Sequence, residues 1–342
     1  MKNRLFYWSG PHVNVQEGNY IYDRFVKDGY DIKPYYDYIL GNGTDLKKRM
    51  KRYRQNLFSI FFASRQDDVI FVNDSSRAWL LALFFSVFCM KRDVVINNYM
   101  YDGAGILKKK LLKLAFNNMR VSVNSPAIKN ILQSDLGGVE DKIFVIPDCA
   151  ELFGEDFEEK WKNSPRSTNP PYVFMGGNTR RDFDMVLRIA DSHPEWNFVI
   201  VAPVIEKERF KNKSLRNVKV FFSVTTQEFV TKLLASKVVF IPLKSEFQGG
   251  QLVLFESALL GKPMITTDTH AIRMYFDDQS CGLVPMGDDE AAMGAIRKVF
   301  DMKDDEIKKQ CDVAYKQIKK FSADYCYGLI KKMIETDGTG KR

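Results

Sequence analysis

Short apolar runs recur along the first half of the chain, separated by stretches with the spacing of helices. They cover residues 5–8, 69–72, 94–97, 121–123 and 143–146. The first is followed by a turn and a predicted helix at 18–27, and the apolar stretch at 76–90 has the length of a buried helix. Continuous apolar strands that alternate with helices indicate a parallel sheet covered on both faces.

A polar, proline-rich segment at 163–171 interrupts this alternation, and the pattern then starts again. Predicted strands follow at residues 172–175, 198–202, 218–222, 238–242 and 264–266. From residue 289 onward the pattern is helical, with two predicted helices within 304–335. We therefore expect an α/β protein with two parallel-sheet domains, one at residues 1–165 and one at 166–319.

Length and composition agree with two packed domains. The chain has 342 residues, of which 45% are hydrophobic and 27% charged, which argues against extensive disorder. No C-x-x-C pair occurs among its five cysteines, so free thiols and a reducing compartment are expected. The amino-terminal sequence has no signal-peptide pattern and no apolar run has the length of a membrane span, so a cytoplasmic location is expected.

Two glycine-containing segments in the second half carry the candidate chemistry. In the first, a strand runs into Gly176, Gly177 and Asn178 and then into Arg180 and Arg181. Glycines let backbone N–H groups approach a phosphate, and arginines near a helix start stabilise its charge. The segment suits a diphosphate, although an ordinary strand-to-helix turn has the same features.

The other strong segment spans residues 240–263. A strand ends at Pro242, a loop follows, and a helix that contains Glu256 runs to Gly261. The loop ends with Gln248, Gly249, Gly250 and Gln251. Two weaker segments lie nearby, one with Ser223, Val224 and the predicted N-cap Thr226, the other at residues 281–292.

Together these four segments resemble the donor domain of GT-B-fold glycosyltransferases, in particular the group 1-like enzymes that build bacterial surface polysaccharides and glycolipids. The resemblance implies two Rossmann-like domains that face a cleft, with a last helix at about 320–342 packed on the first domain. It also implies that Glu256 binds ribose hydroxyls. Many family members have a second glutamate at the position of Gln248, and an amide there cannot carry charge. The donor site implied consists of Gly176, Gly177, Asn178, Arg180, Arg181, Ser223, Val224, Gln248, Gly249, Gly250, Gln251 and Glu256.

In this family the first domain holds the acceptor, and inverting members supply a general base from it. His12, after the first strand, is one candidate base, since a histidine titrates near neutral pH. Asp102 and Glu17 are the others. Each also has a simpler interpretation as a loop, turn or helix-start residue, and retention or inversion of the anomeric carbon stays open.

Positive charge concentrates in two amphipathic stretches of the first half. The net charge is +8, and cationic runs accompany apolar faces at residues 46–61 and 106–114. Two basic helices suit the anionic surface of a membrane, and a lipid-linked acceptor would explain them. The alternative is that both are domain helices with solvated basic faces.

The sequence thus predicts a cytoplasmic glycosyltransferase, peripheral on the inner face of the cytoplasmic membrane. It would move a sugar from a nucleotide-sugar, with UDP favoured, to a lipid-linked or saccharide hydroxyl. No metal or other cofactor is expected, because clustered ligands are missing from the sequence and the family needs none. An epimerase acting on free nucleotide-sugars is an alternative, whereas a nucleic-acid-binding protein would need a recognition motif that the sequence lacks.

Overall fold

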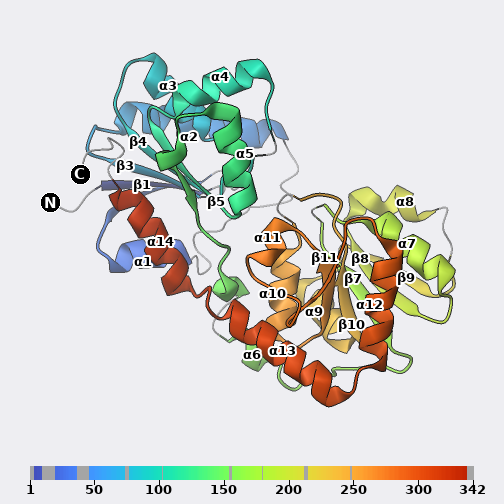
Figure 1. Cartoon of the computed structure of the whole chain (residues 1–342). Helices are drawn as coiled ribbons and strands as arrows, with labels where there is room; N and C mark the ends of the chain where they lie inside the picture. Colours follow the sequence, from blue (N-terminus) through green and yellow to red (C-terminus); the bar gives the residue numbers. More distant parts are fainter. Residues whose placement is uncertain are drawn as a thin grey trace. The chain divides into compact units, whose positions relative to one another are not determined.

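The computed structural model describes residues 4–9, 20–36, 46–73, 77–101, 103–153, 156–178, 180–211, 215–246 and 249–336 (Figure 1). The chain divides into two compact units, Met1–Leu152 with Ser322–Arg342, and Phe153–Phe321. The boundary expected after residue 165 therefore lies earlier. Residues 153–165 belong to the second unit. There the Nζ of Lys319 lies 3.2 Å from a carboxylate oxygen of Glu158 and forms an ion pair with it.

The first unit is built on a six-stranded parallel sheet with the order β2-β1-β3-β4-β5-β6. Its strands are β1 (Arg4–Ser9), β2 (Asp31–Tyr36), β3 (Val69–Asn73), β4 (Asp93–Asn97), β5 (Met119–Val123) and β6 (Ile143–Val145). Its helices are α1 (Tyr20–Lys27), α2 (Leu46–Ala63), α3 (Trp79–Val87), α4 (Ile106–Ala115), α5 (Pro126–Leu136), η1 (Glu140–Lys142) and α14 (Ala323–Glu335), and η2 (Ala150–Phe153) spans the boundary.

Helices cover both faces of this sheet. Neighbouring strand residues point to opposite faces, and Tyr7 packs against Phe25 of α1, whereas Trp8 lies 5.2 Å from the ring of Tyr53 on α2. The face under α1 also receives α14, whose Tyr327, Ile330 and Met333 complete that core (Figure 1). On α2 the predicted apolar stripe is confirmed, because Tyr53, Leu57 and Ile60 are buried.

One buried arginine attaches α14 to the sheet. Arg120, on β5, donates to both carboxylate oxygens of Asp93 on β4. The same guanidinium donates to the carbonyls of Met333, Ile334 and Thr336 at the end of α14. A segment from the far end of the sequence is thereby part of the first unit.

The second unit contains another six-stranded parallel sheet, with the order β12-β11-β10-β7-β8-β9. Its strands are β7 (Tyr172–Gly176), β8 (Asn197–Ala202), β9 (Val218–Phe222), β10 (Val238–Ile241), β11 (Met264–Thr267) and β12 (Gly282–Val284). Its helices are α6 (Phe157–Lys160), α7 (Phe183–Ser192), η3 (Val204–Glu206), α8 (Lys207–Lys211), α9 (Thr226–Ala235), α10 (Gln251–Leu259), α11 (His270–Arg273), α12 (Asp289–Asp301) and α13 (Asp304–Ile318).

The expected α/β class with two parallel sheets is confirmed. Buried residues of β7, β8 and β10 form the core of the second unit together with α7 and α12. Within the described parts of the chain, none of the helices combines the length and apolar character required to cross a bilayer.

Replacing Arg120 by alanine is expected to loosen α14. The change leaves the Asp93 carboxylate and the α14 carbonyls without their buried donor, so the first unit should lose about 3–5 kcal/mol of stability. Hydrogen exchange should accelerate in peptides covering residues 323–335 and stay unchanged in the second unit. Arg188→Ala, which removes the exposed pair with Asp289, is the control and should cost about 1 kcal/mol or less. Unchanged exchange of α14 in Arg120→Ala would contradict this anchoring role.

Candidate functional site

Two strand ends meet in the middle of the second sheet. Strands β7 and β10 are hydrogen-bonded neighbours in parallel, so the segments that follow them leave the same edge of the sheet. These segments are joined by backbone bonds from Asp182 N to the Pro242 carbonyl and from Lys244 N to the Arg180 carbonyl, each 2.9 Å long. The structure thus brings together the two glycine-containing segments that the sequence singled out.

A buried arginine fills the space between their turns. Arg181 is only 6% exposed, and its Nε donates to the carbonyl of Gly176 at 2.8 Å. A Cβ at Gly177 would lie 2.3 Å from a guanidinium nitrogen of Arg181, and one at Gly250 would lie 3.5 Å from another. Both glycines have positive φ, at 107° and 88°. A side chain at position 177 would therefore collide with the guanidinium, whereas at position 250 it is the positive φ that favours glycine.

Burial lowers the pKa of Arg181 to about 10, because the charged form loses hydration. The side chain is still cationic at neutral pH. A desolvated, fixed cation interacts more strongly with an incoming anion than a solvated one does.

The start of α10 lies beside this cation. Gly250 is the N-cap residue and has no side chain with which to cap the helix. The first N–H groups of a helix have no partner within the helix, so such an end attracts anions. An anion next to Gly250 would meet these N–H groups and the guanidinium of Arg181.

Helix α10 also supplies two buried polar side chains. Glu256 is 8% exposed, and burial raises its carboxyl pKa to about 8. The amide Nε2 of Gln251 is buried and has no hydrogen-bond partner among the residues that the structure describes. Buried polar groups are normally paired, so both side chains are suited to hydrogen bonds with a polar ligand.

The residues around the first turn have distinct environments. Gly176 packs under α9, since a Cβ there would lie 2.5 Å from the ring of Phe229. Asn178 is exposed. Arg180 adopts a left-handed backbone with φ 59° and donates to the hydroxyl of Ser245 at 3.2 Å, toward the loop before α10.

Ser223 and Val224 follow β9 at the edge of the sheet, away from the two central turns. Ser223 is exposed and has a φ of 54°. The N-cap of α9 is Thr225 instead of the expected Thr226, because the Thr225 hydroxyl accepts from the Glu228 N–H at 3.2 Å in a capping box. The same helix presents Phe229 to Gly176, which links the edge loop to the centre through α9.

A further pair of ionisable side chains was not anticipated from the sequence. The Nδ1 of His270, at the start of α11, lies 3.3 Å from a carboxylate oxygen of Glu246 in the loop after β10. Thr269 caps the start of α11. A threonine at this place was the sequence feature that could have indicated a helix start here, and with it the position of His270. Both side chains are exposed, so the pair lies at the surface of the loop.

Several predicted residues lie outside the described parts of the chain. They are Gln248 of the loop before α10 and the three candidate bases His12, Glu17 and Asp102. Their roles stay predictions. Among the described residues, no group of three or more His, Cys, Asp and Glu side chains is placed to hold a metal ion.

Part of the chain matches a known protein family. Residues 180–302 match the family of group 1 glycosyl transferases, a span that includes Arg181, both buried α10 residues and the Gly250 turn. No curated protein matches the sequence.

Among solved structures, the chain resembles a glycosyltransferase from Rickettsia africae at 14% identity, with a TM-score of 0.70 over 98% of this chain and 100% of that one. A UDP-forming α,α-trehalose-phosphate synthase from Burkholderia vietnamiensis gives 12% identity and a TM-score of 0.71, covering 99% and 98%. The lipopolysaccharide outer core galactosyltransferase WaaB gives 14% identity and a TM-score of 0.66, covering 96% and 99%. At such identities the likeness concerns the fold, which extends over nearly the full length of each chain. Residues 180–302 thus match the group 1 glycosyl transferase family, and the chain over nearly its full length shares the fold of these solved structures.

Proposed function

We propose that the second unit binds the diphosphate of a nucleotide-sugar, with UDP favoured, and that the enzyme transfers the sugar to a hydroxyl of a lipid-linked or saccharide acceptor. The observation that carries this proposal is the guanidinium of Arg181, buried between the turns at Gly177 and Gly250 beside the amino-terminal end of α10. A cation and helix N–H groups that converge on one point suit a diphosphate.

The proposed role of these groups in sugar transfer depends on where negative charge develops during the reaction. When the bond between the anomeric carbon and the diphosphate oxygen breaks, charge develops on the departing diphosphate. Arg181 and the N–H groups of α10 would stabilise this charge, because they are held in place before the reaction and need no reorganisation. Arg180, on the surface of the same turn, adds a second positive charge.

The remaining donor contacts are assigned from burial. Glu256 would hydrogen-bond the ribose hydroxyls, with its carboxyl shielded from water. Gln251 would direct its unpartnered Nε2 to a sugar or phosphate oxygen. The edge loop with Ser223 and Val224 would contact the base, and Asn178, Gln248 and Gly249 would complete the site.

The names of two similar proteins support the finer parts of the proposal. The Burkholderia synthase is UDP-forming, and WaaB is a galactosyltransferase of the lipopolysaccharide outer core. For this chain we propose a UDP-sugar donor and a role in assembling surface polysaccharide, capsule or glycolipid. His12, Glu17 and Asp102 are the candidate bases, and activity should persist in the presence of EDTA if no metal takes part.

A lipid-linked acceptor would place the enzyme on the inner face of the cytoplasmic membrane. The basic helices α2 and α4 support this location. Helix α2 contains no acidic residue, and lysines follow one another in α4. Each basic residue near an anionic bilayer contributes about 1 kcal/mol.

Uridine diphosphate is expected to raise the melting temperature of the wild-type protein in a thermal-shift panel that also contains GDP, CMP and ADP. Arg181→Lys keeps a charge but loses the planar fork, so affinity for the bound nucleotide should fall about 10- to 100-fold by calorimetry. Arg188→Lys, altering an exposed arginine of the same unit, is the matched control and should bind as the wild type does. Normal binding by Arg181→Lys would make this site assignment wrong.

A methyl group at position 177 is expected to displace Arg181. Gly177→Ala introduces a Cβ into the space of the guanidinium, so kcat/KM for transfer should fall about 100-fold. Gly287→Ala is the control, because Gly287 also has a positive φ, 73°, but no atom lies within 4 Å of its added Cβ. Both variants bear backbone strain of about 1–2 kcal/mol, and only the first should lose activity. Equal activity of the two variants would contradict the role of Arg181.

The buried carboxyl of Glu256 is expected to make stability depend on pH. Its folded pKa of about 8 exceeds the ordinary value of 4.5, so the folded protein keeps a proton that the unfolded chain releases. Stability should therefore fall as pH rises from about 5 to 8, by on the order of 1 kcal/mol per pH unit.

In Glu256→Gln this pH-dependent loss should disappear, because the amide does not titrate. Urea unfolding between pH 5 and 8.5 measures the slope for both proteins. Glu246→Gln, which alters an exposed carboxyl of the same unit, should keep the wild-type slope. A wild-type slope in Glu256→Gln would show that the carboxyl is ionised in the folded protein.

Transfer and epimerisation are separated by one assay. The enzyme with UDP-sugar alone should leave the sugar configuration unchanged, and UDP release should require an added hydroxyl acceptor. Conversion of the free donor to its epimer, without any acceptor, would favour the epimerase.

A further inference from the structure

The first unit exposes a cluster of aromatic side chains. Phe58 and Phe62 on α2 are 51% and 79% exposed, and Phe88, directly after α3, is 64% exposed. These three rings surround two inner ones. Phe61 lies 5.2 Å from Phe62 and 5.6 Å from Phe88, and Phe84 lies 6.3 Å from Phe58. With the neighbouring Val87, also exposed, the outer side chains form one surface, here called the aromatic patch (Phe58, Phe62, Val87 and Phe88).

Packing within the unit does not account for this patch. Helix α2 contacts the sheet through Tyr53, Leu57 and Ile60, which are buried. Phe58 and Phe62 lie on another side of the helix and, despite their ring contacts with Phe84 and Phe61, remain at least half exposed. Single exposed apolar residues are ordinary, but contiguous ones mark an interaction surface.

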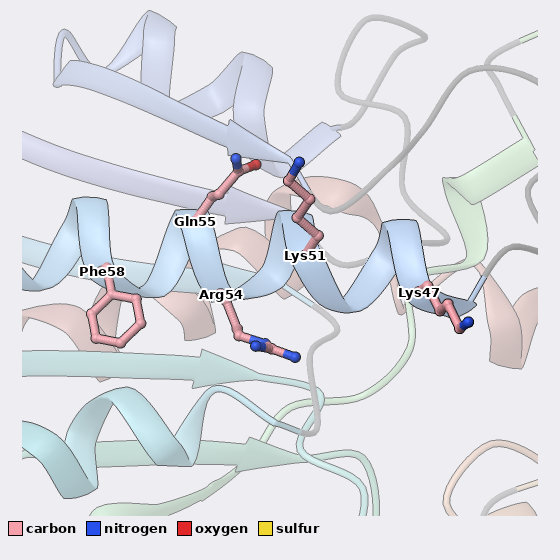
Figure 2. A pocket seen from close by; sticks show the side chains of 5 residues that line it. All are labelled: Lys47, Lys51, Arg54, Gln55 and Phe58. Atoms are coloured by element: carbon pink, nitrogen blue, oxygen red, sulfur yellow. The ribbon is translucent and has the colours of Figure 1, made fainter.

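Cations continue the same stripe of α2 toward its amino end. At 3.6 residues per turn, Lys47, Lys51 and Arg54 fall within the sector of the helix that carries Phe58 and Phe62. A cavity of about 390 Å³ is lined by Lys47, Lys51, Arg54, Gln55 and Phe58. Figure 2 shows these five side chains spread along α2, with Arg54 and Phe58 projecting on the same side.

The charge around the patch has one sign along α2. The helix itself contains no Asp or Glu. Arg65, just after α2, and Lys91, just after Phe88, are also exposed. An apolar patch flanked by cations is complementary to an anionic bilayer, in which apolar acyl chains lie beneath negatively charged headgroups.

We propose that this face of the first unit docks on an anionic lipid bilayer. Phe58, Phe62 and Phe88 enter the boundary between headgroups and acyl chains, while Lys47, Lys51 and Arg54 contact lipid phosphates. This inference deepens the proposed function, since it rests on an acceptor located at the membrane, and it assigns the docking surface to the aromatic patch and not to the basic runs alone. A bilayer fits this surface because the cations and the apolar rings occupy one continuous stripe of α2.

Cosedimentation of the full chain with vesicles tests the surface. Vesicles of phosphatidylethanolamine with phosphatidylglycerol present negative charge, whereas vesicles of phosphatidylcholine do not. The wild type should bind the first and show little binding to the second. The double variant Phe62→Ser/Phe88→Ser should lower the partition coefficient at least about tenfold at any salt concentration. The triple variant Lys47→Gln/Lys51→Gln/Arg54→Gln should lose about fivefold per cation, and its residual binding should depend less on salt than that of the wild type.

A matched control is available on the second unit. Ile205, in η3, is 86% exposed and lies outside the patch, so Ile205→Ser should bind vesicles like the wild type. All altered side chains are exposed, and unchanged thermal unfolding will show that the variants are folded. Wild-type binding by the double variant, equal binding to both kinds of vesicle, or no binding to either would overturn the proposal.

Nucleotide binding separates this proposal from the donor-site proposal. The vesicle-binding variants should keep the full thermal shift with uridine diphosphate. Vesicle binding without any nucleotide shift in the wild type would leave the docking surface standing and remove the donor site. A nucleotide shift without vesicle binding would do the reverse.

Discussion

The burial of one guanidinium constrains the centre of the second unit. Arg181 occupies the space between two turns, and its Nε bond to the Gly176 carbonyl fixes its direction. The turns on either side need glycine, one because a Cβ would meet the guanidinium and one because the backbone enters α10 in a left-handed conformation. Since burial lowers the pKa of Arg181 only to about 10, the position carries a permanent charge.

That charge determines what else the site needs. A buried cation beside the amino-terminal end of a helix concentrates positive potential at one point, which favours an anionic ligand there. Burial also raises the pKa of Glu256 on α10 to about 8, and its carboxyl offers a hydrogen-bonding group to a sugar hydroxyl. The polar character of the site therefore depends on the burial of α10 as much as on the types of residue that the site contains.

The two faces of the first sheet are covered by different helices. One face is closed by α1 and α14, and Arg120 holds α14 through the carbonyls at its end. The other face is closed by α2 and α3 and leaves aromatic rings outside. A face that is complete yet still exposes clustered rings has apolar surface available for a partner, which is why the docking proposal concerns α2 and α3 and not α14.

The sequence by itself determined the two parallel sheets, because buried strands read as apolar runs whatever surrounds them. It also pointed to the glycine turns and to Glu256 through a family resemblance that the match over residues 180–302 supports. It missed β2, whose exposed and half-buried residues lack an apolar run, and it set the unit boundary at a proline-rich segment that packs with the second unit. Only the tertiary structure decided that Gly176 accommodates Phe229, that Arg181 is buried while Arg180 reaches the next loop, and that Phe58 and Phe62 face outward while Leu57 and Ile60 face inward. These facts depend on which side of a turn or helix meets another segment, and a linear pattern of residue types contains no such information.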